Sequence, residues 1–235
     1  MARTELLNNV QHAELKIKPE YGAAYQHNVM SIPVFPAEAR LAQGHYPLLF
    51  TRNEQDRYQM VALLGFEQGE NLYLEQGEWA AAYKPLMIEK GPFVIGRHPD
   101  NPDSLSVHIE LDDPRVSNSE GQPLFLPHGG TTDYTDNIAN VLSTLHESQS
   151  AHADFVSQCL ALELIESFVL DIDMPQGGTH RLSGFYTVNE EKLAGLTAEQ
   201  LSELHSSGHL HTLYMMLASL SNLSVLIRKK QARQA

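Results

Sequence analysis

The segment HYPLLFTRNEQDRYQMVALLGFEQGENLYLEQGEWAAAYKPLMIEKGPFVIG, residues 45–96, decides the fold class of this chain. Two apolar runs, 47–51 and 58–65, flank a charged tip at 53–56, and this order is typical of a β-hairpin. A turn at 69–71 then leads into a third apolar run. The segment therefore predicts antiparallel strands in the first half of the chain, and it contains no recognisable catalytic signature.

A second strand pattern lies at 104–111, where apolar and polar residues alternate. Because side chains of a strand point alternately to its two faces, the alternation predicts one apolar and one polar face. The two faces carry, respectively, Leu105, Val107, Ile109 and Leu111, and Ser106, His108 and Glu110.

The second half of the chain changes to helical periodicity. From residue 132 an apolar stripe predicts a helix, and a second helix is expected over about 151–165. A β-hairpin follows, with strands at 168–173 and 180–188 joined through 175–178.

Three polar or small residues mark the boundaries of the last helices. Asn189 is expected to cap a short helix, and Thr197 stands at capping-box spacing from Gln200. Gly208 separates that helix from a final leucine-rich helix.

This order of elements predicts an α+β fold, because strands concentrate early and helices late without strict alternation. We expect an N-terminal antiparallel β-rich part, a partly open barrel or sheet, followed by a helical part with an inserted β-hairpin. A single domain over 1–235 is the preferred organisation. A subdivision into a β-rich part, 31–128, and a helix-rich part, 131–235, is the alternative.

The charge balance argues against a nucleic-acid partner. The chain has 16 basic and 29 acidic residues and a formal net charge of −13, so its overall field repels phosphate. A basic cluster at Arg228, Lys229, Lys230 and Arg233 is expected to form a frayed, solvated tail after the last helix.

Three sequence features bear on the cellular location of the protein: apolar runs, the N-terminal residues and the cysteine content. We expect no membrane span, because no run approaches about 18 apolar residues. The N-terminal residues do not read as a signal peptide, and the single cysteine, Cys159, lies in an apolar stretch typical of a buried thiol. A cytoplasmic protein is therefore the expectation.

Three blocks of this sequence resemble the SapC family of bacterial proteins. They are 46–50 with 61–66 and 69–72; Trp79 with 83–85 and 92–93; and 182–193 with 201–208 and 218–222. The resemblance implies an accessory intracellular role in the uptake or modification of a small molecule or peptide. It supplies no catalytic residue.

An aromatic set surrounds two prolines near the centre of the chain. Trp79, Tyr83 and Phe93 are candidates for lining a groove that binds an extended peptide or small molecule. Core packing is the alternative for the same residues.

His108 and Glu110 form the sharpest candidate metal pair. A His-x-carboxylate start on a strand, with a distant histidine, is the ligand pattern of a non-haem iron site. His128, His146 and His180 are the candidate third ligands, and nothing in the sequence selects among them. The alternative is that His108 and Glu110 belong to a solvated strand face.

Three functional hypotheses follow. The first is a non-enzymatic accessory or binding module for a small molecule or peptide. The second is a metal-dependent, oxygenase-like enzyme that uses His108 and Glu110. The third, suggested by the family name, is an assembly or secretion factor for surface-layer proteins. Whether the protein is an enzyme stays open, no cofactor is assigned, and the apolar C-terminal helix is a candidate surface for homo-oligomers.

Overall fold

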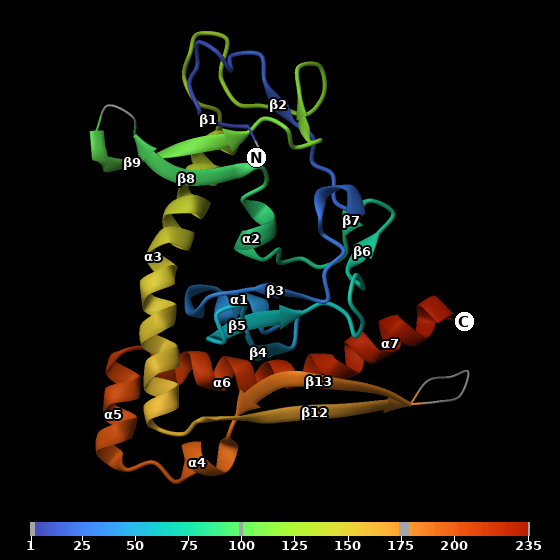
Figure 1. Cartoon of the computed structure of the whole chain (residues 1–235), viewed down its shortest axis with the longest axis vertical. Helices are drawn as coiled ribbons and strands as arrows, with labels where there is room; N and C mark the ends of the chain where they lie inside the picture. Colours follow the sequence, from blue (N-terminus) through green and yellow to red (C-terminus); the bar gives the residue numbers. More distant parts are fainter. Residues whose placement is uncertain (1–2, 99–100, 174–178, 235) are drawn as a thin grey trace. The chain divides into compact units, whose positions relative to one another are not determined.

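The computed structural model describes residues 3–98, 101–173 and 179–234. It contains 38% helix and 27% strand, and its antiparallel sheets are open in the described residues rather than closed into a barrel. The predicted α+β class is confirmed, in its sheet form and not its barrel form. The chain forms two compact units, each assembled from several segments (Figure 1).

Unit 1 consists of Met1–His27, Leu74–Trp79 and Leu86–Glu147, and unit 2 of Asn28–Tyr73, Ala80–Pro85 and Ser148–Ala235. Each unit takes segments from both halves of the chain. The units therefore do not coincide with the two parts 31–128 and 131–235.

Unit 1 contains two three-stranded antiparallel sheets and a short ribbon. The first sheet has the order β1 (Thr4–Leu6), β9 (Asn101–Glu110), β8 (Phe93–His98), and the second the order β10 (Val116–Ser117), β2 (Lys16–Ile17), β11 (Gln122–Pro123). The ribbon pairs β6 (Leu74–Glu75) with β7 (Glu78–Trp79), and the helical pieces are η1 (Ala23–Tyr25), α2 (Leu86–Glu89) and the first part of α3 (Asp133–Ala161).

The core of unit 1 joins the two sheets to α3. Its buried members are Ile17, Phe93, Ile109, Leu124, Ile138 and Leu142. The predicted apolar face of β9 enters this core through Val107, Ile109 and Leu111, whereas Leu105 is 47% exposed. Leu105 pairs with Arg97 far along the β8–β9 ribbon, where the core cluster no longer covers the strand. After β11 the chain forms an isolated antiparallel bridge between Phe125 and Thr131.

Unit 2 is built on one five-stranded antiparallel sheet. Its spatial order is β12 (Ile165–Asp173), β13 (Thr179–Val188), β4 (Leu48–Arg52), β5 (Tyr58–Leu63) and β3 (Ser31–Pro33). The predicted hairpin around 53–56 is confirmed as β4–β5, with Leu48 opposite Ala62 and Arg52 opposite Tyr58. The predicted hairpin of β12 and β13 is also confirmed, and its connecting residues 175–178 lie outside the described residues.

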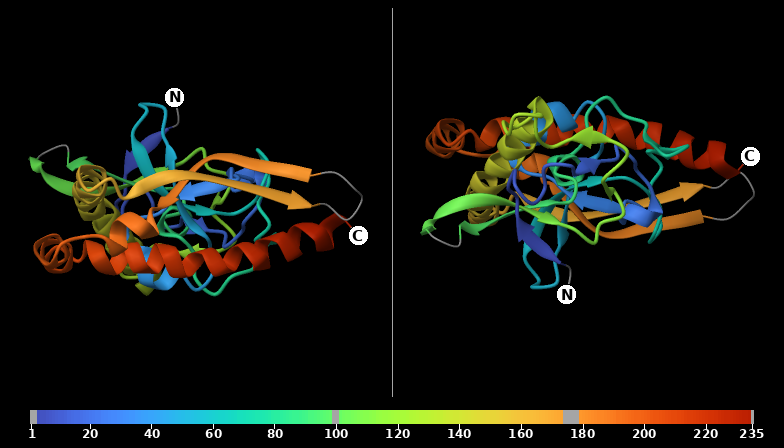
Figure 2. Two further views of the ribbon diagram at one scale, coloured as in Figure 1. Left: turned by 90° about the horizontal axis from the view of Figure 1, so that it is seen from below. Right: turned by 90° about the horizontal axis from the view of Figure 1, so that it is seen from above.

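Unit 2 also contains helical elements. They are η2 (Pro36–Glu38), α1 (Ala39–Ala42), the second part of α3, α4 (Glu190–Ala194), α5 (Ala198–Ser206), α6 (His209–Ser219), η3 (Leu220–Asn222) and α7 (Leu223–Gln234). Helix α6 packs against β13 and β4 and runs on through η3 into α7 (Figure 2). The caps at Asn189 and at Thr197 with Gln200 are confirmed, as is the separation of two helices at Gly208.

Two helix boundaries differ from the sequence-based expectation. The two helices expected after residue 132 are the single 29-residue α3, because the polar residues 146–150 include neither glycine nor proline. The single helix expected after Gly208 is divided by the η3 turn.

The predicted solvated basic tail is wrong. Lys230 is only 5% exposed, and its ammonium lies 2.7 Å from both Glu67 Oε1 and Glu70 Oε1. The Arg233 guanidinium donates to the Asn71 carbonyl at 3.0 Å, and Lys229 lies over the Tyr73 ring. The basic residues therefore dock α7 onto the segment that follows β5.

The C-terminal helical segment also bears on the predicted absence of a membrane span. His209–Arg233 is long and apolar enough to cross a membrane by length and composition alone, and 28% of its most apolar window is buried within the structure. Ser219 Oγ accepts from Leu48 N, and Asn222 Nδ2 donates to Gln43 O. These contacts are those of a helix packed on a sheet. The absence of a membrane span and the use of this helix for oligomers both stay predictions.

Candidate ligand-binding site

Unit 1 contains a cavity of about 440 Å³ with a mixed polar and apolar lining. This volume lies within the range of small-molecule sites. The lining residues are Arg3, Glu5, Gln11, His12, Leu15, Leu111, Val116, Ser117 and Asn118. They come from β1, the loop after it, and the segment that follows β9.

The register between β1 and β9 determines where the charged residues of the cavity, Arg3 and Glu5, lie. Glu5 lies opposite Ile109, so both side chains project from the same face of the sheet. Arg3 lies two residues before Glu5 and shares this face. The Arg3 backbone is fixed at both polar groups, because its N–H donates to Asp112 Oδ2 and its carbonyl accepts from Leu111 N, each at 2.8 Å.

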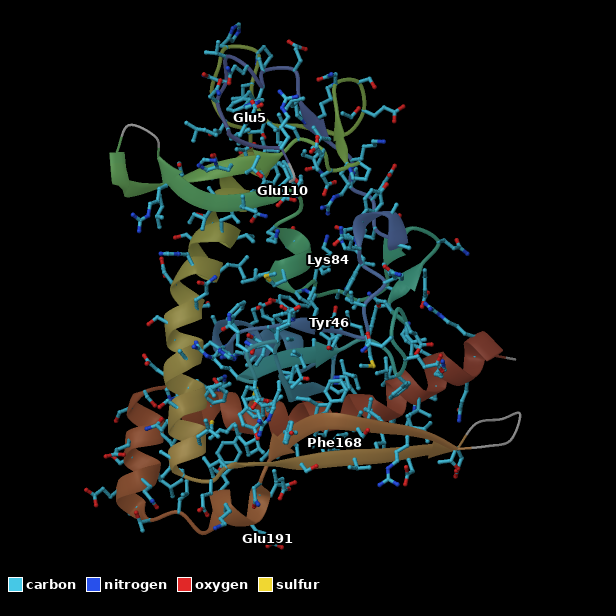
Figure 3. All side chains as sticks on the ribbon, in the orientation of Figure 1. Glu5, Tyr46, Lys84, Glu110, Phe168 and Glu191 are labelled. Atoms are coloured by element: carbon cyan, nitrogen blue, oxygen red, sulfur yellow. The ribbon has the colours of Figure 1, made fainter. Side chains whose placement is uncertain are left out.

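Arg3 and Glu5 form a surface ion pair at the cavity. Arg3 Nε donates to Glu5 Oε1 at 2.8 Å, and Arg3 Nη2 lies 2.8 Å from the same oxygen. The Arg3 hydrogen bond lowers the pKa of Glu5, so the carboxylate is ionised at neutral pH. The Arg3 side chain is 67% exposed, and a guanidinium carries five N–H donors, so it has donors beyond those that face Glu5. Figure 3 labels Glu5 among the side chains around β1.

The buried side chain of His12 contacts Glu5 of this pair. Its Nδ1 accepts the Asn8 backbone N–H at 3.2 Å, which leaves Nε2 to carry the proton of the neutral ring. Nε2 lies 3.5 Å from Glu5 Oε2, and the ring is almost fully buried. Since both nitrogens face partners in the structure, His12 orients Glu5 and does not itself point a base at the cavity.

The loop that carries His12 is folded by its own polar side chains. Asn8 Oδ1 accepts from the backbone N–H groups of Val10 and Gln11, and Asn8 Nδ2 donates to Gln11 Oε1. Such bonds from an asparagine to nearby backbone stabilise a turn without a helix or strand. The loop is thereby held in the conformation that brings Gln11 and His12 to the cavity.

Three apolar residues complete the lining, together with the polar Ser117 and Asn118. Leu15, Leu111 and Val116 line the cavity and also pack against the core cluster of unit 1. The site thus combines a fixed cation, a fixed carboxylate and an apolar surface backed by the core.

The predicted aromatic residues lie elsewhere. Phe93 is 0% exposed in the core of unit 1, with its ring edge-on to Tyr134 at 6.3 Å. Trp79 is also buried in unit 1, with its ring 6.2 Å from that of Tyr21. The burial of Phe93 and Trp79 agrees with the core-packing alternative, and neither residue is among those that line the cavity.

Tyr83 belongs to unit 2. Its hydroxyl donates to Glu38 Oε1 at 2.8 Å, and its carbonyl accepts from the Tyr46 hydroxyl. Glu38 is buried and also accepts from Phe35 N through Oε2. Tyr83 therefore has a structural role in fixing a buried carboxylate, and ligand contact by Tyr83 stays a prediction.

The predicted metal pair is placed on one face of β9, as the alternation requires, but His108 is already engaged. His108 Nε2 lies 3.2 Å from Ser106 Oγ. Its ring packs over Gly96, where a Cβ would lie 2.7 Å from the ring. Glu110 acts electrostatically on Lys90, where burial lowers the lysine pKa and the Glu110 charge opposes that shift.

Among the side chains that the structure describes, no third metal ligand joins this pair. His128 and His146 are exposed, and the side chain of His180 lies outside the described part of the chain. Across residues 3–98, 101–173 and 179–234, the structure has no group of three or more histidine, cysteine, aspartate or glutamate side chains that could hold a metal ion. The iron hypothesis gains no support from the geometry.

Sequence reasoning missed Arg3, Glu5 and His12, because residues 1–30 are polar and only weakly periodic. The only local signal is the Arg-x-Glu spacing, which places two opposite charges on one face of a strand. The contribution of His12 depends on a loop fold that leaves no simple periodicity.

The fold and cavity define a class: an α+β protein of two compact units, one of which carries a polar cavity. The chain belongs to the SapC family, whose model matches residues 7–226. That match includes His12 and excludes Arg3 and Glu5. No curated protein and no solved structure matches the chain.

Proposed function

We propose that this SapC-family protein is a non-enzymatic binding module for a small molecule, and that the cavity of unit 1 is its site. The observation that carries the proposal is the Arg3–Glu5 pair, which presents both signs of charge above an apolar surface. Coupling to uptake or modification is a part of this proposal that rests on the resemblance alone, and location in the cytoplasm rests on the sequence patterns described above.

The lining specifies the chemistry of the ligand. A guanidinium binds a carboxylate through paired N–H donors, and a carboxylate accepts from an ammonium group. Leu15, Leu111 and Val116 provide a surface for an apolar group. The ligand class that uses all three features is a small zwitterion with an apolar side chain, such as a free amino acid or the end of a short peptide.

Isothermal titration with a matched ligand set tests the proposal. We expect L-leucine to bind more tightly than leucinol, which lacks the carboxylate, and than isocaproate, which lacks the ammonium group. Arg3→Met should remove the preference for leucine over leucinol, and Glu5→Gln the preference over isocaproate. Lys192→Met is the control, because it breaks the exposed Lys192–Glu163 pair of unit 2 and should leave all three affinities unchanged.

Native mass spectrometry of the untagged protein provides a test that does not assume the ligand. A retained organic adduct that disappears in the Arg3→Met variant supports the site. An adduct retained equally in wild type, Arg3→Met and Glu5→Gln would place the ligand elsewhere. A stoichiometric iron or zinc ion would contradict the non-enzymatic assignment and favour the metal hypothesis.

A further inference from the structure

Strand β12 forms an open edge of the sheet in unit 2. It is nine residues long and, among the described residues, pairs only with β13. An edge strand directs half of its backbone N–H and C=O groups away from its neighbour. These groups form a regular row of donors and acceptors at which another extended chain can pair.

The two edges of this sheet differ in how they are protected. The opposite edge, β3, has three residues and ends at Pro33, which has no N–H to donate. Strand β12 contains neither proline nor glycine. The edge formed by β12 is therefore the one that can accept a further strand.

The β12–β13 hairpin also extends beyond the rest of the sheet. In the described residues β13 pairs with β4 only at Phe185 and Tyr186, and the run 179–182 pairs with β12 alone. Between Phe168 and Leu170, β13 takes three steps for two on β12, and Gly184 has a φ of +85° at this bulge. A two-stranded ribbon is marginally stable by itself, and a third strand increases its stability.

The exposed side chains of β12 define the partner. They are Glu166, Ser167, Val169, Asp171 and Asp173. The acidic side chains favour a positively charged partner, and Val169, 46% exposed, provides an apolar contact. Arg181 on the neighbouring strand lies 3.8 Å from Asp171, and both side chains are more than half exposed.

We infer that β12 is a docking strand for an extended, basic peptide segment, which adds to the sheet next to β12. The backbone of β12 supplies the hydrogen bonds, and Asp171 and Asp173, which share one face of the strand, select lysine or arginine at alternate positions of the peptide. This partner site is separate from the small-molecule cavity of unit 1 and does not rest on that proposal.

A second copy of this chain is the less favourable occupant. Antiparallel self-pairing of β12 would bring together the carboxylates of Asp171 and Asp173, which share one face, with the Glu166 carboxylates on the opposite face. Each copy also carries a net charge of −13, which opposes close approach. Charge complementarity therefore favours a basic partner over self-association.

Fluorescence anisotropy with a short, capped peptide of alternating lysine and valine tests the inference. We expect binding that weakens about tenfold or more when valine amides are N-methylated, because methylation removes strand hydrogen bonds and keeps the charge. Replacing lysine with glutamate in the peptide should abolish binding. Hydrogen exchange should show new protection of β12 amides when the lysine peptide is added.

Matched charge variants separate strand addition from general attraction. Asp171→Lys with Asp173→Lys should weaken binding about tenfold, because both changes lie on the face of β12 that meets the lysine side chains. Glu199→Lys with Glu203→Lys makes the same charge change on exposed positions of α5 and should have a much smaller effect. Equal binding of the N-methylated peptide, equal effects of the two double variants, or a dimer that protects β12 amides without peptide would each overturn the inference.

Discussion

Different kinds of interaction stabilise each of the two units of this protein. Unit 2 is organised by a five-stranded sheet whose central strands are deeply buried, with Leu48, Leu49 and Phe50 in β4 all 0% exposed. Unit 1 contains several strands of only two or three residues, and polar side chains fix much of its irregular backbone. Unit 1, which has the less regular structure, is therefore the unit that carries a cavity lined by an ion pair, Arg3–Glu5. Binding residues often lie on such segments, which a packed core holds in place.

The largest effect should come from removing a core ring in either unit. Phe50→Ala in unit 2 and Phe93→Ala in unit 1 should each lower the free energy of unfolding by about 3–5 kcal/mol, because both rings are fully buried. Phe168→Ala on the half-buried hairpin should cost about 1 kcal/mol. Urea unfolding gives these values.

Native-state hydrogen exchange on the same variants tests whether the comparison extends to cooperativity. We expect Phe93→Ala to lower protection mainly in unit 1, and Phe50→Ala mainly in unit 2. Equal loss of protection across both units in either variant would show that they unfold as one.

The next largest effect should come from the docked basic cluster of unit 2. Lys230→Met leaves Glu70, only 17% exposed in its side chain, without its ammonium partner and should cost about 3 kcal/mol. Lys192→Met breaks the exposed pair with Glu163 and should change stability by less than about 0.5 kcal/mol. Thermal unfolding of the two variants measures the difference, and similar values would mean that Lys230 contributes no more than a surface charge.

Acid should weaken both units over the same pH range. Burial lowers the pKa of His27 in unit 1 and of His152 in unit 2 to about 4, and His152 Nε2 accepts from Met60 N at 3.0 Å. The unfolded chain takes up these protons near pH 6.5, whereas the folded protein does not until about pH 4. Stability should therefore fall as pH decreases from 6.5 to 4, by at most about 3 kcal/mol for each histidine.

Urea unfolding at a series of pH values between 7.5 and 4.5 measures this loss. His152→Gln keeps an acceptor for the Met60 N–H and should reduce the pH dependence of unit 2 alone. An unchanged pH profile in that variant would show that His152 is not the group that titrates.

The smallest effects should come from two glycines that are required for different reasons. Gly184→Ala in unit 2 meets no atom within 4 Å, so its cost of about 1 kcal/mol comes only from the φ of +85°. Gly96→Ala in unit 1 has no such φ but places a Cβ 2.7 Å from the His108 ring. We expect about 1–2 kcal/mol there. His108→Ala should relieve the Gly96→Ala penalty in a double-mutant cycle and leave the Gly184→Ala penalty unchanged.

Much of the fold can be predicted from local signals. The β4–β5 hairpin follows from two apolar runs around a charged tip, and the caps at Asn189 and Thr197 follow from the hydrogen-bonding chemistry of their side chains. The helix boundary at Gly208 follows from the left-handed φ that glycine adopts easily. The break expected inside α3 was wrong because polar residues alone do not end a helix.

The candidate site was much less predictable. Arg3 and Glu5 become a site only because β1 pairs with β9, more than 100 residues later in the chain. A register between strands so far apart leaves no local pattern. The predicted His108–Glu110 pair had a local pattern, and the structure gives His108 a contact with Ser106 and a packing position over Gly96.

The sequence by itself determined the α+β class, the two main hairpins, the helix caps and the SapC family. These depend on periodicity and on single residues, which act over a few positions. Only the tertiary structure decided which charges pair, that Lys230 docks α7 onto Glu67 and Glu70, and that Arg3, Glu5 and His12 meet at one cavity. The physical reason is that electrostatic and packing partners are set by distance in the folded chain, and residues more than 100 positions apart can contact one another without any shared sequence signal.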